Sequence, residues 1–280
     1  MSRVAIATAR GADDPDDPLL FRALADADID ADLAIWDDDA VRWDDYDLVV
    51  VRSTWDYPVR RDDFLAWAHT IARLENPWSV LQYSSDKIYL ADVEAHGLSI
   101  IPSHFAAVGE TPEFFAGDFV VKPRVGAGSN DAMRYREGEE EAATRHVEAL
   151  HARGRDVLIQ PYIHSVDTLG ERALIFIDGQ YSHAITKGAM LNVPPDERDF
   201  LYRREQIMSV TAENDAVRTA TNVLATLGFD SLLYARVDLV ATIRGWLVME
   251  IELVEPSLFL TYHEATATAL ARSIARRLRH

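Results

Sequence analysis

The first eighty residues alternate short apolar runs with amphipathic stretches, and this alternation constrains the fold more than any other feature. Residues 3–8, 31–36 and 48–52 have the length of strands, and the third contains the uninterrupted apolar run Leu48-Val49-Val50-Val51. Such runs are typical of parallel strands covered by helices on both faces. The sequence therefore predicts an α/β fold that begins with a small Rossmann-like unit over residues 1–80.

The turn after the first strand argues against a dinucleotide-dependent dehydrogenase. Residues 9–13 lack the Gly-x-Gly-x-x-Gly pattern that forms a tight turn over a pyrophosphate. The third strand leads instead into a cluster of donors and aromatic residues, at the strand end where ligands gather in open α/β sheets. This cluster comprises Arg52, Ser53, Thr54, Trp55, Asp56 and Tyr57.

Two interpretations of this cluster stay open. In the first it is the wall of a substrate pocket, with Arg52 for a carboxylate and Asp56 for an amine. In the second, Ser53 or Thr54 caps a helix and the aromatic residues are packing. The two interpretations are compatible, because a cap can also orient a binding loop.

The rest of the chain continues the mixture of helices and strands. Further helices are expected at 17–28, 62–74, 86–96, 137–153, 214–227 and 264–279. Further strands are expected at 119–122, 156–160, 172–177, 180–187, 233–240 and 245–253, with a long connection from Lys187 to about Met208. We expect three units: residues 1–80, a central lid subdomain at 81–160, and a C-terminal subdomain at 161–280.

Composition excludes several classes of protein. The formal charge of -18 argues against a nucleic-acid-binding surface. The absence of cysteine excludes disulfides, thiolate metal sites and cysteine nucleophiles. Neither a signal-peptide pattern nor an apolar stretch of ~20 residues is present, so no membrane partner and a cytoplasmic location are expected. The aspartate runs at 13–17 and 37–39 are interpreted as solvated loop charge.

Lysine is rare in this chain, and each of the three lysines lies in a short motif that is suited to phosphate binding. Only three of the 28 lysine and arginine residues are lysines. Lys87 follows Ser85-Asp86, Lys122 precedes the glycine-containing stretch 125–130, and Lys187 ends a strand. A lysine is a compact charge that reaches phosphate on a flexible stem, which arginine does not replace. The pattern indicates that the three lysines bind phosphate groups. The alternative is that they remain by chance in a sequence shaped by codon bias.

Acidic residues on the last two strands form a second pattern. Glu250 and Glu252 are two apart and so point to one face of a strand, and Asp238 on the adjoining strand can face them. Three converging carboxylates repel one another unless divalent cations sit among them, and magnesium prefers such oxygen ligands. A solvent-facing strand pair with incidental acids is the alternative. The apolar residues that alternate with the two glutamates favour the metal site.

These motifs, taken in order, resemble the ATP-grasp superfamily. The order is Ser-Asp-Lys, Val-Val-Lys-Pro with a glycine loop, Gln-Pro-Tyr, a basic residue, and Asp before a Glu-x-Glu pair, over about residues 84–260. The strings at 51–57, 181–184 and 255–259 are similar to the O-ureido-serine cyclo-ligase (cycloserine synthetase) group and its glutathione-synthetase-like relatives. The resemblance implies an ATP-grasp fold preceded by a Rossmann-like domain.

The resemblance also implies roles for individual residues. Lys87 and Lys122 would contact the phosphates of ATP, Lys187 and Arg236 would serve the transferred phosphoryl group or the substrate carboxylate, and Asp238, Glu250 and Glu252 would bind Mg2+. The last position is often Asn in the family and is Glu here, which leaves the number of metals open. The nucleotide would further be held by Gly126, Gly128, Ser129, Gln160, Pro161 and Tyr162. The substrate would be held by Arg52, Thr54, Trp55, Asp56, Tyr57 and Ser257.

The implied activity is an ATP-dependent carboxylate-amine ligase. It would activate a small amino-acid-like carboxylate as an acylphosphate and form an amide-type bond, with intramolecular ring closure as one form, in antibiotic biosynthesis. A homodimer is the family-based default. Two alternatives stay open: a nucleotide-binding sensor or partner module without turnover, and a ligase that adds glutamate to a peptide or protein tail. The acidic surface disfavours the latter, because it would repel an acidic acceptor.

Overall fold

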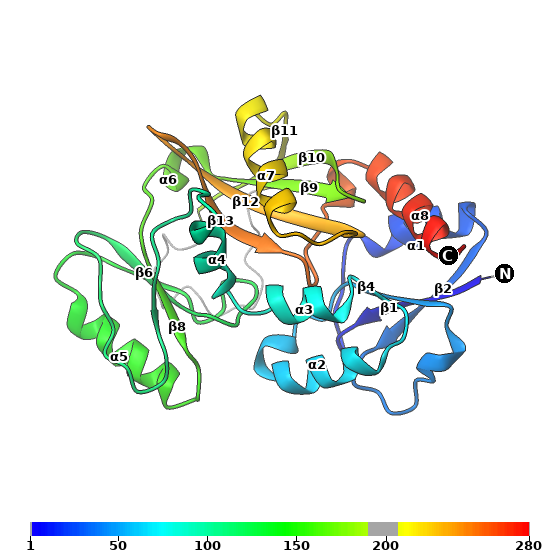
Figure 1. Ribbon diagram of the computed structural model, residues 1–280, viewed down its shortest axis with the longest axis horizontal. Helices are drawn as coiled ribbons and strands as arrows, with labels where there is room; N and C mark the ends of the chain where they lie inside the picture. The colour runs from blue at the N-terminus through cyan, green and yellow to red at the C-terminus, as the bar shows by residue number, and fades with distance from the viewer. Residues whose placement is uncertain (1, 190–206, 280) are drawn as a thin grey trace.

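A computed structural model of the chain describes residues 2–189 and 207–279. Its strands form three sheets, and Figure 1 shows the central sheet between a parallel N-terminal sheet and a smaller sheet at the opposite end. This arrangement confirms the prediction of an α/β protein. The expected connection from Lys187 to about Met208 lies largely outside the described residues.

The N-terminal sheet is parallel and covered on both faces, as the apolar runs predict. Its strands are β1 (Ser2–Thr8), β2 (Ile29–Ile35), β3 (Leu48–Val51) and β4 (Leu74–Glu75), in the order β2-β1-β3-β4. Alternate residues of β1 enter different cores. Val4 and Ile6 pack toward α1 (Asp17–Asp26) and α8 (Ala265–Arg277), whereas Ala5 and Ala7 pack toward α2 (Arg61–Thr70).

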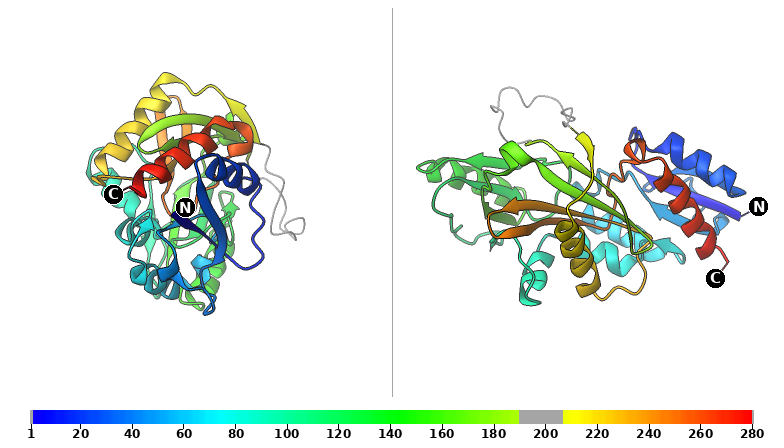
Figure 2. Two further views of the ribbon diagram at one scale, coloured as in Figure 1. Left: turned by 90° about the vertical axis from the view of Figure 1, so that its right-hand side faces the viewer. Right: turned by 90° about the horizontal axis from the view of Figure 1, so that it is seen from above.

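The central sheet is antiparallel and carries most of the charged residues singled out above. Its order is β11-β10-β9-β12-β13. The strands are β9 (Glu171–Ile177), β10 (Gln180–Lys187), β11 (Ile207–Val210), β12 (Tyr234–Thr242) and β13 (Gly245–Glu252). Helix α7 (Asn214–Thr226) covers one face. The C-terminal helix α8 packs against β9 and lies beside α1 (Figure 2).

The third sheet is a four-stranded antiparallel layer backed by one long helix. It consists of β5 (His104–Ala106), β6 (Phe119–Pro123), β7 (Met133–Tyr135) and β8 (Val157–Pro161), in the order β5-β8-β6-β7. Helix α5 (Glu140–His151) packs on it through Ala143, Val147 and Leu150. The remaining helices are α3 (Trp78–Ser84), α4 (Tyr89–Ala95) and α6 (Val166–Leu169), with 3-10 turns at Trp43–Asp45, Tyr57–Val59 and Leu260–Tyr262.

Several element predictions need correction. The helix expected over 62–74 ends at Thr70, and Leu74 instead pairs with Val49 in β4. Trp78, expected in a turn, begins α3, and the helix expected from residue 86 begins only at Tyr89. Strands β5, β7 and β11 were not predicted. Each has three or four residues, which is too short for a periodic pattern, so their extended form depends on pairing with a neighbour.

The buried side chain of Asn76 joins the N-terminal part to the central sheet. Its Nδ2 donates to the carbonyl oxygens of Tyr234 (3.0 Å) and Leu253 (2.8 Å), and its Oδ1 accepts from the backbone N–H of Leu233 (2.8 Å). Three hydrogen bonds from one fully buried amide fix the end of β13 against the first unit. The division at 80 and 160 stays a proposal, because α8 packs on the first unit.

Within the described ranges, no helix has both the length and the hydropathy needed to cross a bilayer.

Candidate active site

A cavity of about 1160 Å3 lies where loops of the N-terminal sheet, strands of the central sheet and the edge of the third sheet meet. The three lysines Lys87, Lys122 and Lys187 all line it, although they come from three separate parts of the chain. So do Gly126, Gly128, Ser129, Gln160, Pro161, Tyr162, Arg236, Glu250, Glu252, Trp55, Asp56, Tyr57 and Ser257. Asp238, Arg52 and Thr54 do not line the cavity and are buried behind its wall.

The three lysines differ in how they are paired. The Lys87 Nζ donates to the carbonyl oxygen of Gly126 (2.7 Å) and lies 2.9 Å from Glu250 Oε1. The Lys187 Nζ lies 2.7 Å from Asp238 Oδ2 and 3.1 Å from Glu171 Oε2. In the part of the chain that the structure describes, the Lys122 ammonium has no hydrogen-bond or ion-pair partner. Lys122 is therefore the cation most available to an anion in the cavity.

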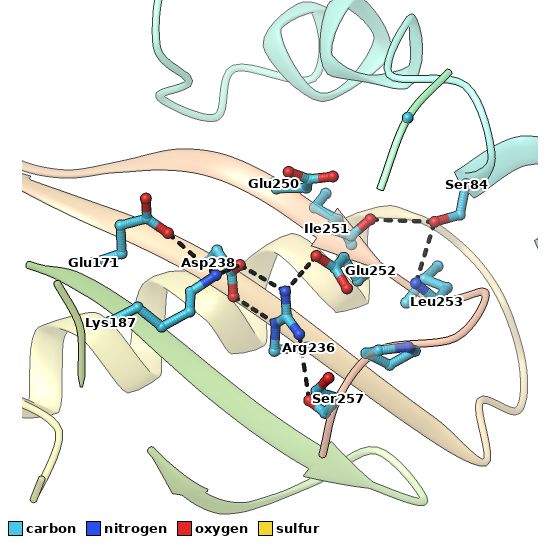
Figure 3. Close-up of polar contacts among 12 residues, drawn as sticks. Ser84, Glu171, Lys187, Arg236, Asp238, Glu250, Ile251, Glu252, Leu253 and Ser257 are labelled. Carbon is cyan, nitrogen blue, oxygen red and sulfur yellow. Dashed lines mark hydrogen bonds and ion pairs between the residues drawn. The ribbon is translucent and has the colours of Figure 1, made fainter. Parts of the chain in front are cut away.

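An alternating chain of acids and bases crosses β9, β10, β12 and β13, as Figure 3 shows. Arg236 stands opposite Glu252 and Asp238 opposite Glu250 in the antiparallel register. The Arg236 guanidinium reaches Asp238 through Nε (2.9 Å) and Nη2 (3.0 Å), and it also bonds Glu252. Lys187 approaches Asp238 from β10. Cross-strand pairing therefore places these five side chains on one face of the sheet.

The three predicted acids lie on one face of the sheet, but cations are interleaved with them. Asp238 and Glu250 are opposite each other, as predicted, yet cations stand beside each acid: Lys187, Arg236 and Lys87. Within residues 2–189 and 207–279, no group of three or more His, Cys, Asp or Glu side chains is arranged as a metal site. Like charges on adjoining strands repel, and interleaved cations relieve that repulsion.

The electrostatics of the acids follow from these neighbours. Burial alone would raise the pKa of Asp238, but Arg236 and Lys187 hold it down to about 2. For Glu250, Lys87 and Lys122 outweigh burial and lower the pKa. For Glu252, burial and the charges of Glu250 and Asp238 outweigh Arg236 and raise the pKa to about 7. Of these three acids, Asp238 is therefore the best compensated by neighbouring cations and Glu252 the least.

The Ser-Asp-Lys motif and the glycine loop are joined to each other. Arg124, two residues beyond Lys122, forms a two-pronged ion pair with Asp86 (3.0 and 2.7 Å), and its carbonyl oxygen accepts from the Lys87 N–H (3.1 Å). The loop then turns with φ of +61° at Gly128 and +57° at Ser129. Positive φ at Gly128 is a conformation that a residue without Cβ adopts at low cost.

Gln160, Pro161 and Tyr162 close another side of the cavity at the end of β8. The Gln160 amide donates to Ser103 Oγ (2.9 Å), and the Tyr162 N–H donates to the carbonyl oxygen of Asp118 (2.8 Å). The Arg134 guanidinium stacks 3.6 Å from the centre of the Tyr162 ring. These contacts fix a flat aromatic surface against the cavity.

The cluster after β3 only partly faces the cavity. Trp55, Asp56 and Tyr57 line it, whereas Arg52 is 1% exposed and donates to the Pro256 carbonyl oxygen (2.8 Å) and to Asp14 Oδ2 (3.4 Å). Thr54 is fully buried. The structure therefore does not bring Arg52 or Thr54 to the cavity; Arg52 instead ties β3 to the segment after β13.

Asp56 faces the cavity but already has partners. Its Oδ1 accepts from Trp36 Nε1 (2.9 Å) and its Oδ2 from Arg60 Nη2 (2.6 Å). The solvated interpretation of the first aspartate run also fails in part, because Asp14 and Asp16 are buried beside Arg52, at 3.4 and 3.9 Å. Arg52 compensates the charge of these buried aspartates. Because Arg52 is far from them in the sequence, the local run of aspartates does not reveal this pairing.

Sequence reasoning missed Gly170, Glu171 and Glu255. Glu171 pairs with Lys187 across β9 and β10, and Glu255 lines the cavity three residues beyond Glu252. The string 255–259 carried a weak signal for Glu255. Gly170, between α6 and β9, has φ +67° and ψ -178°, a region that only glycine occupies readily. A Cβ there would meet the Lys187 carbonyl oxygen and Thr186 Cγ2, each at 2.5 Å.

We expect Gly170→Ala to disturb the position of Lys187 as well as stability. The backbone strain costs about 1–3 kcal/mol, and relief of the contact with Lys187 shifts the end of β10. Because small misplacement of a binding group is costly, turnover should fall roughly 10²-fold. Gly179→Ala is the matched control: it lies at φ +73° at the other end of the same hairpin, with nothing near its Cβ position. Equal activity losses in the two variants would contradict the role of Gly170.

Comparisons with known proteins agree with this geometry. The model of the D-cycloserine synthetase DcsG N-terminal domain matches residues 4–76. The cycloserine biosynthesis protein DcsG of Streptomyces lavendulae is 40% identical over 285 residues, which covers 95% of each chain. The crystal structure of D-cycloserine synthetase DcsG superposes with a TM-score of 0.89 at 37% identity, over 99% of this chain and 100% of that one.

A structure with much lower sequence identity shares the fold over the whole chain. The D-alanine–D-alanine ligase of Bacillus anthracis has a TM-score of 0.69 at 14% identity, over 100% of this chain and 98% of that one. Similarity at that level concerns the fold, whereas the 40% identity shows a common family. The chain therefore belongs to the cycloserine synthetase family and is an ATP-dependent ligase with the ATP-grasp fold, which forms an amide-type bond in antibiotic biosynthesis.

Proposed function

We propose that this protein closes the ring of D-cycloserine from O-ureido-D-serine with the consumption of ATP. The observation that carries the proposal is the 40% identity to a cycloserine biosynthesis protein over nearly the whole of both chains. The cavity supports it, because lysines and acids from separate parts of the chain line one cavity. The intramolecular form follows from the substrate, which contains both the carboxylate and the attacking nitrogen.

The cavity residues fit a nucleotide with magnesium. Lys122 has no partner within the described residues and is available to phosphate oxygens, while Lys87 and Lys187 are held nearby by acids. We propose that Lys87, Lys122, Gly126, Gly128 and Ser129 hold the phosphates, and that Gln160, Pro161 and Tyr162 border the adenine. Glu250 and Glu252 line the cavity and offer the oxygen ligands that Mg2+ prefers. The third predicted ligand, Asp238, is buried behind the cavity wall and is paired with Arg236 and Lys187.

When bound, Mg2+ would neutralise charge on the phosphoryl group that moves. The chain's own residues would hold the reactants. Lys187 and Arg236 lie close enough to share Asp238, and we propose that they stabilise the negative charge on the phosphoryl group and the substrate carboxylate. The walls limit access of water, which would otherwise hydrolyse an acylphosphate.

The proposed reaction balances within one substrate molecule. A carboxylate oxygen takes the γ-phosphoryl group, which leaves ADP and an acylphosphate. The nitrogen bonded to the side-chain oxygen attacks the acyl carbon, the phosphate leaves with the bonding electron pair, and the nitrogen loses its proton. The new ring has five atoms. One water molecule then cleaves the bond between the ring nitrogen and the carbamoyl carbon, the ring nitrogen takes a proton, and the carbamoyl group leaves as carbon dioxide and ammonia. Substrate contacts are proposed for Trp55, Asp56, Tyr57 and Ser257, which line the cavity.

A turnover assay tests the proposed function. Purified protein with ATP, Mg2+ and O-ureido-D-serine should release ADP and phosphate in a one-to-one ratio with cycloserine, measured by coupled spectrophotometry and mass spectrometry. O-ureido-L-serine is the matched control. Calorimetric binding of ATP with no turnover would instead support a nucleotide-binding module. Turnover only with a separate acid and amine would replace ring closure by intermolecular ligation. A homodimer and a cytoplasmic location stay predictions.

A further inference from the structure

One buried acid at the cavity differs from the others in having no counter-charge beside it. Glu171 lies 3.1 Å from Lys187, Glu250 lies 2.9 Å from Lys87, and Glu252 bonds Arg236. Glu255 is only 7% exposed and lines the same cavity. Within residues 2–189 and 207–279 it accepts no hydrogen bond and forms no ion pair.

The backbone around Glu255 is held by hydrogen bonds on both sides. The carbonyl oxygen of Val254 accepts from Tyr234 OH (2.9 Å), and that of Pro256 accepts from Arg52 Nη1 (2.8 Å). The carbonyl oxygen of Ser257 accepts from Arg236 Nη1 (3.3 Å). Three donors, one from Arg52 just after β3 and two from β12, therefore fix the backbone of this segment.

Burying an ionised carboxylate without a cationic partner costs free energy, and this cost raises the pKa of the group. Burial first, and then the charge of Glu252, raise the pKa of Glu255 well above its usual range. A cationic ligand that entered the cavity would remove this penalty, because a buried charge is tolerated when it is paired. Arg236 and Lys87 offset this increase only in part, so a positive group from outside the chain would supply the counter-charge that the described residues do not.

The surroundings of Glu255 favour an ammonium group as that cation. Glu255 lies beyond the end of β13, and its charge contributes to the raised pKa of the buried phenol of Tyr57, which also lines the cavity. An ammonium ion bonds to a carboxylate and also lies favourably against an aromatic ring. Asp56, the acid predicted for this purpose, is already engaged by Trp36 and Arg60.

We propose that Glu255 binds the α-ammonium group of the substrate and thereby selects an amino acid over a simple carboxylic acid. This inference rests on the proposed function, since it assumes a small zwitterionic substrate. Glu255 is then a specificity-determining residue, while the lysines and Arg236 serve the phosphates and the carboxylate. The paired state of Asp56 is explained as well, because its contacts hold the loop that carries Tyr57.

The test is Glu255→Gln, which keeps the size of the side chain and removes its charge. The KM for O-ureido-D-serine should rise about 10²-fold, as for one partner lost from a buried ion pair. The KM for ATP and the Mg2+ dependence should not change. With the analogue that lacks the amino group, 3-(ureidooxy)propanoate, wild type and variant should be equally poor. Glu94→Gln, on the exposed face of α4, is the matched control.

The outcomes separate the inference from the function on which it rests. An equal penalty with and without the substrate amine, or a changed Mg2+ dependence, would overturn the role of Glu255. Calorimetric binding of O-ureido-D-serine needs no turnover. Binding that depends on Glu255 without turnover overturns the proposed function alone, and turnover with binding that is independent of Glu255 overturns the inference alone. Thermal unfolding shows whether the variant is folded; its midpoint should equal or exceed that of wild type.

Discussion

Replacing Lys122 by methionine is expected to abolish nearly all ATP turnover while leaving the protein folded. Lys122 has no hydrogen-bond or ion-pair partner within the described residues, so the substitution breaks neither kind of contact. Burial lowers the pKa of its ammonium group despite the attraction of Glu250. Loss of one preorganised charge at a transferring phosphoryl group should lower kcat by about 10³-fold.

Stability separates this prediction from a general defect. Urea unfolding of Lys122→Met should give a midpoint at or above that of wild type, because a partly desolvated charge is removed. Lys122→Arg keeps the charge with a different shape and should recover activity only in part. Arg145→Met, on the exposed surface of α5, is the control for loss of a cation. Turnover of Lys122→Met within twofold of wild type would refute the role assigned to Lys122.

Arg236→Met, unlike Lys122→Met, is expected to lower the stability of the protein strongly. Arg236 is 5% exposed and its guanidinium bonds both Asp238 and Glu252. Without Arg236, Lys187 is the cation that remains near Asp238 and Glu252. Removing one partner from a buried ion pair costs about 3–5 kcal/mol of stability. Urea unfolding should show a lower midpoint with an unchanged slope. Turnover should be lost as well.

A second substitution tests whether charge balance is the cause. Arg236→Met combined with Glu252→Gln removes one positive and one negative charge, and it should recover at least about 1 kcal/mol of the lost stability. Turnover should remain low in the double variant. Arg42→Met breaks an exposed pair with Asp45 and should cost less than about 1 kcal/mol. A double variant no more stable than Arg236→Met would show that packing around the guanidinium, rather than charge, dominates.

The sequence predicted the parts of the site that depend on local motifs. The two-residue spacing of Glu250 and Glu252 fixes their shared face, and the register of β12 and β13 puts Asp238 opposite Glu250. Lys87 and Lys122 were chosen for their motifs, and both line the cavity. These predictions were accessible because strand periodicity is a local property of the chain.

The parts that were missed depend on residues far apart in sequence. Arg52 was expected to meet substrate, yet it lies against Pro256, 204 residues away. The cations interleaved with the acids come from β10 and from the segment before α4, and no pattern within β13 shows them. Short strands such as β4 were missed for the same reason, since only a neighbouring strand makes two residues extended.

By itself, the sequence determined the order of helices and strands, the parallel N-terminal sheet and the type of chemistry, because hydrophobic periodicity and motif order act over a few residues at a time. Only the tertiary structure decided which charges are already paired. Lys122 and Glu255 have no partner in the described chain, whereas Arg52, Asp56 and Asp238 do. The physical reason is that the cost of burying a charge depends on neighbours brought together by folding, and those neighbours are not adjacent in the chain.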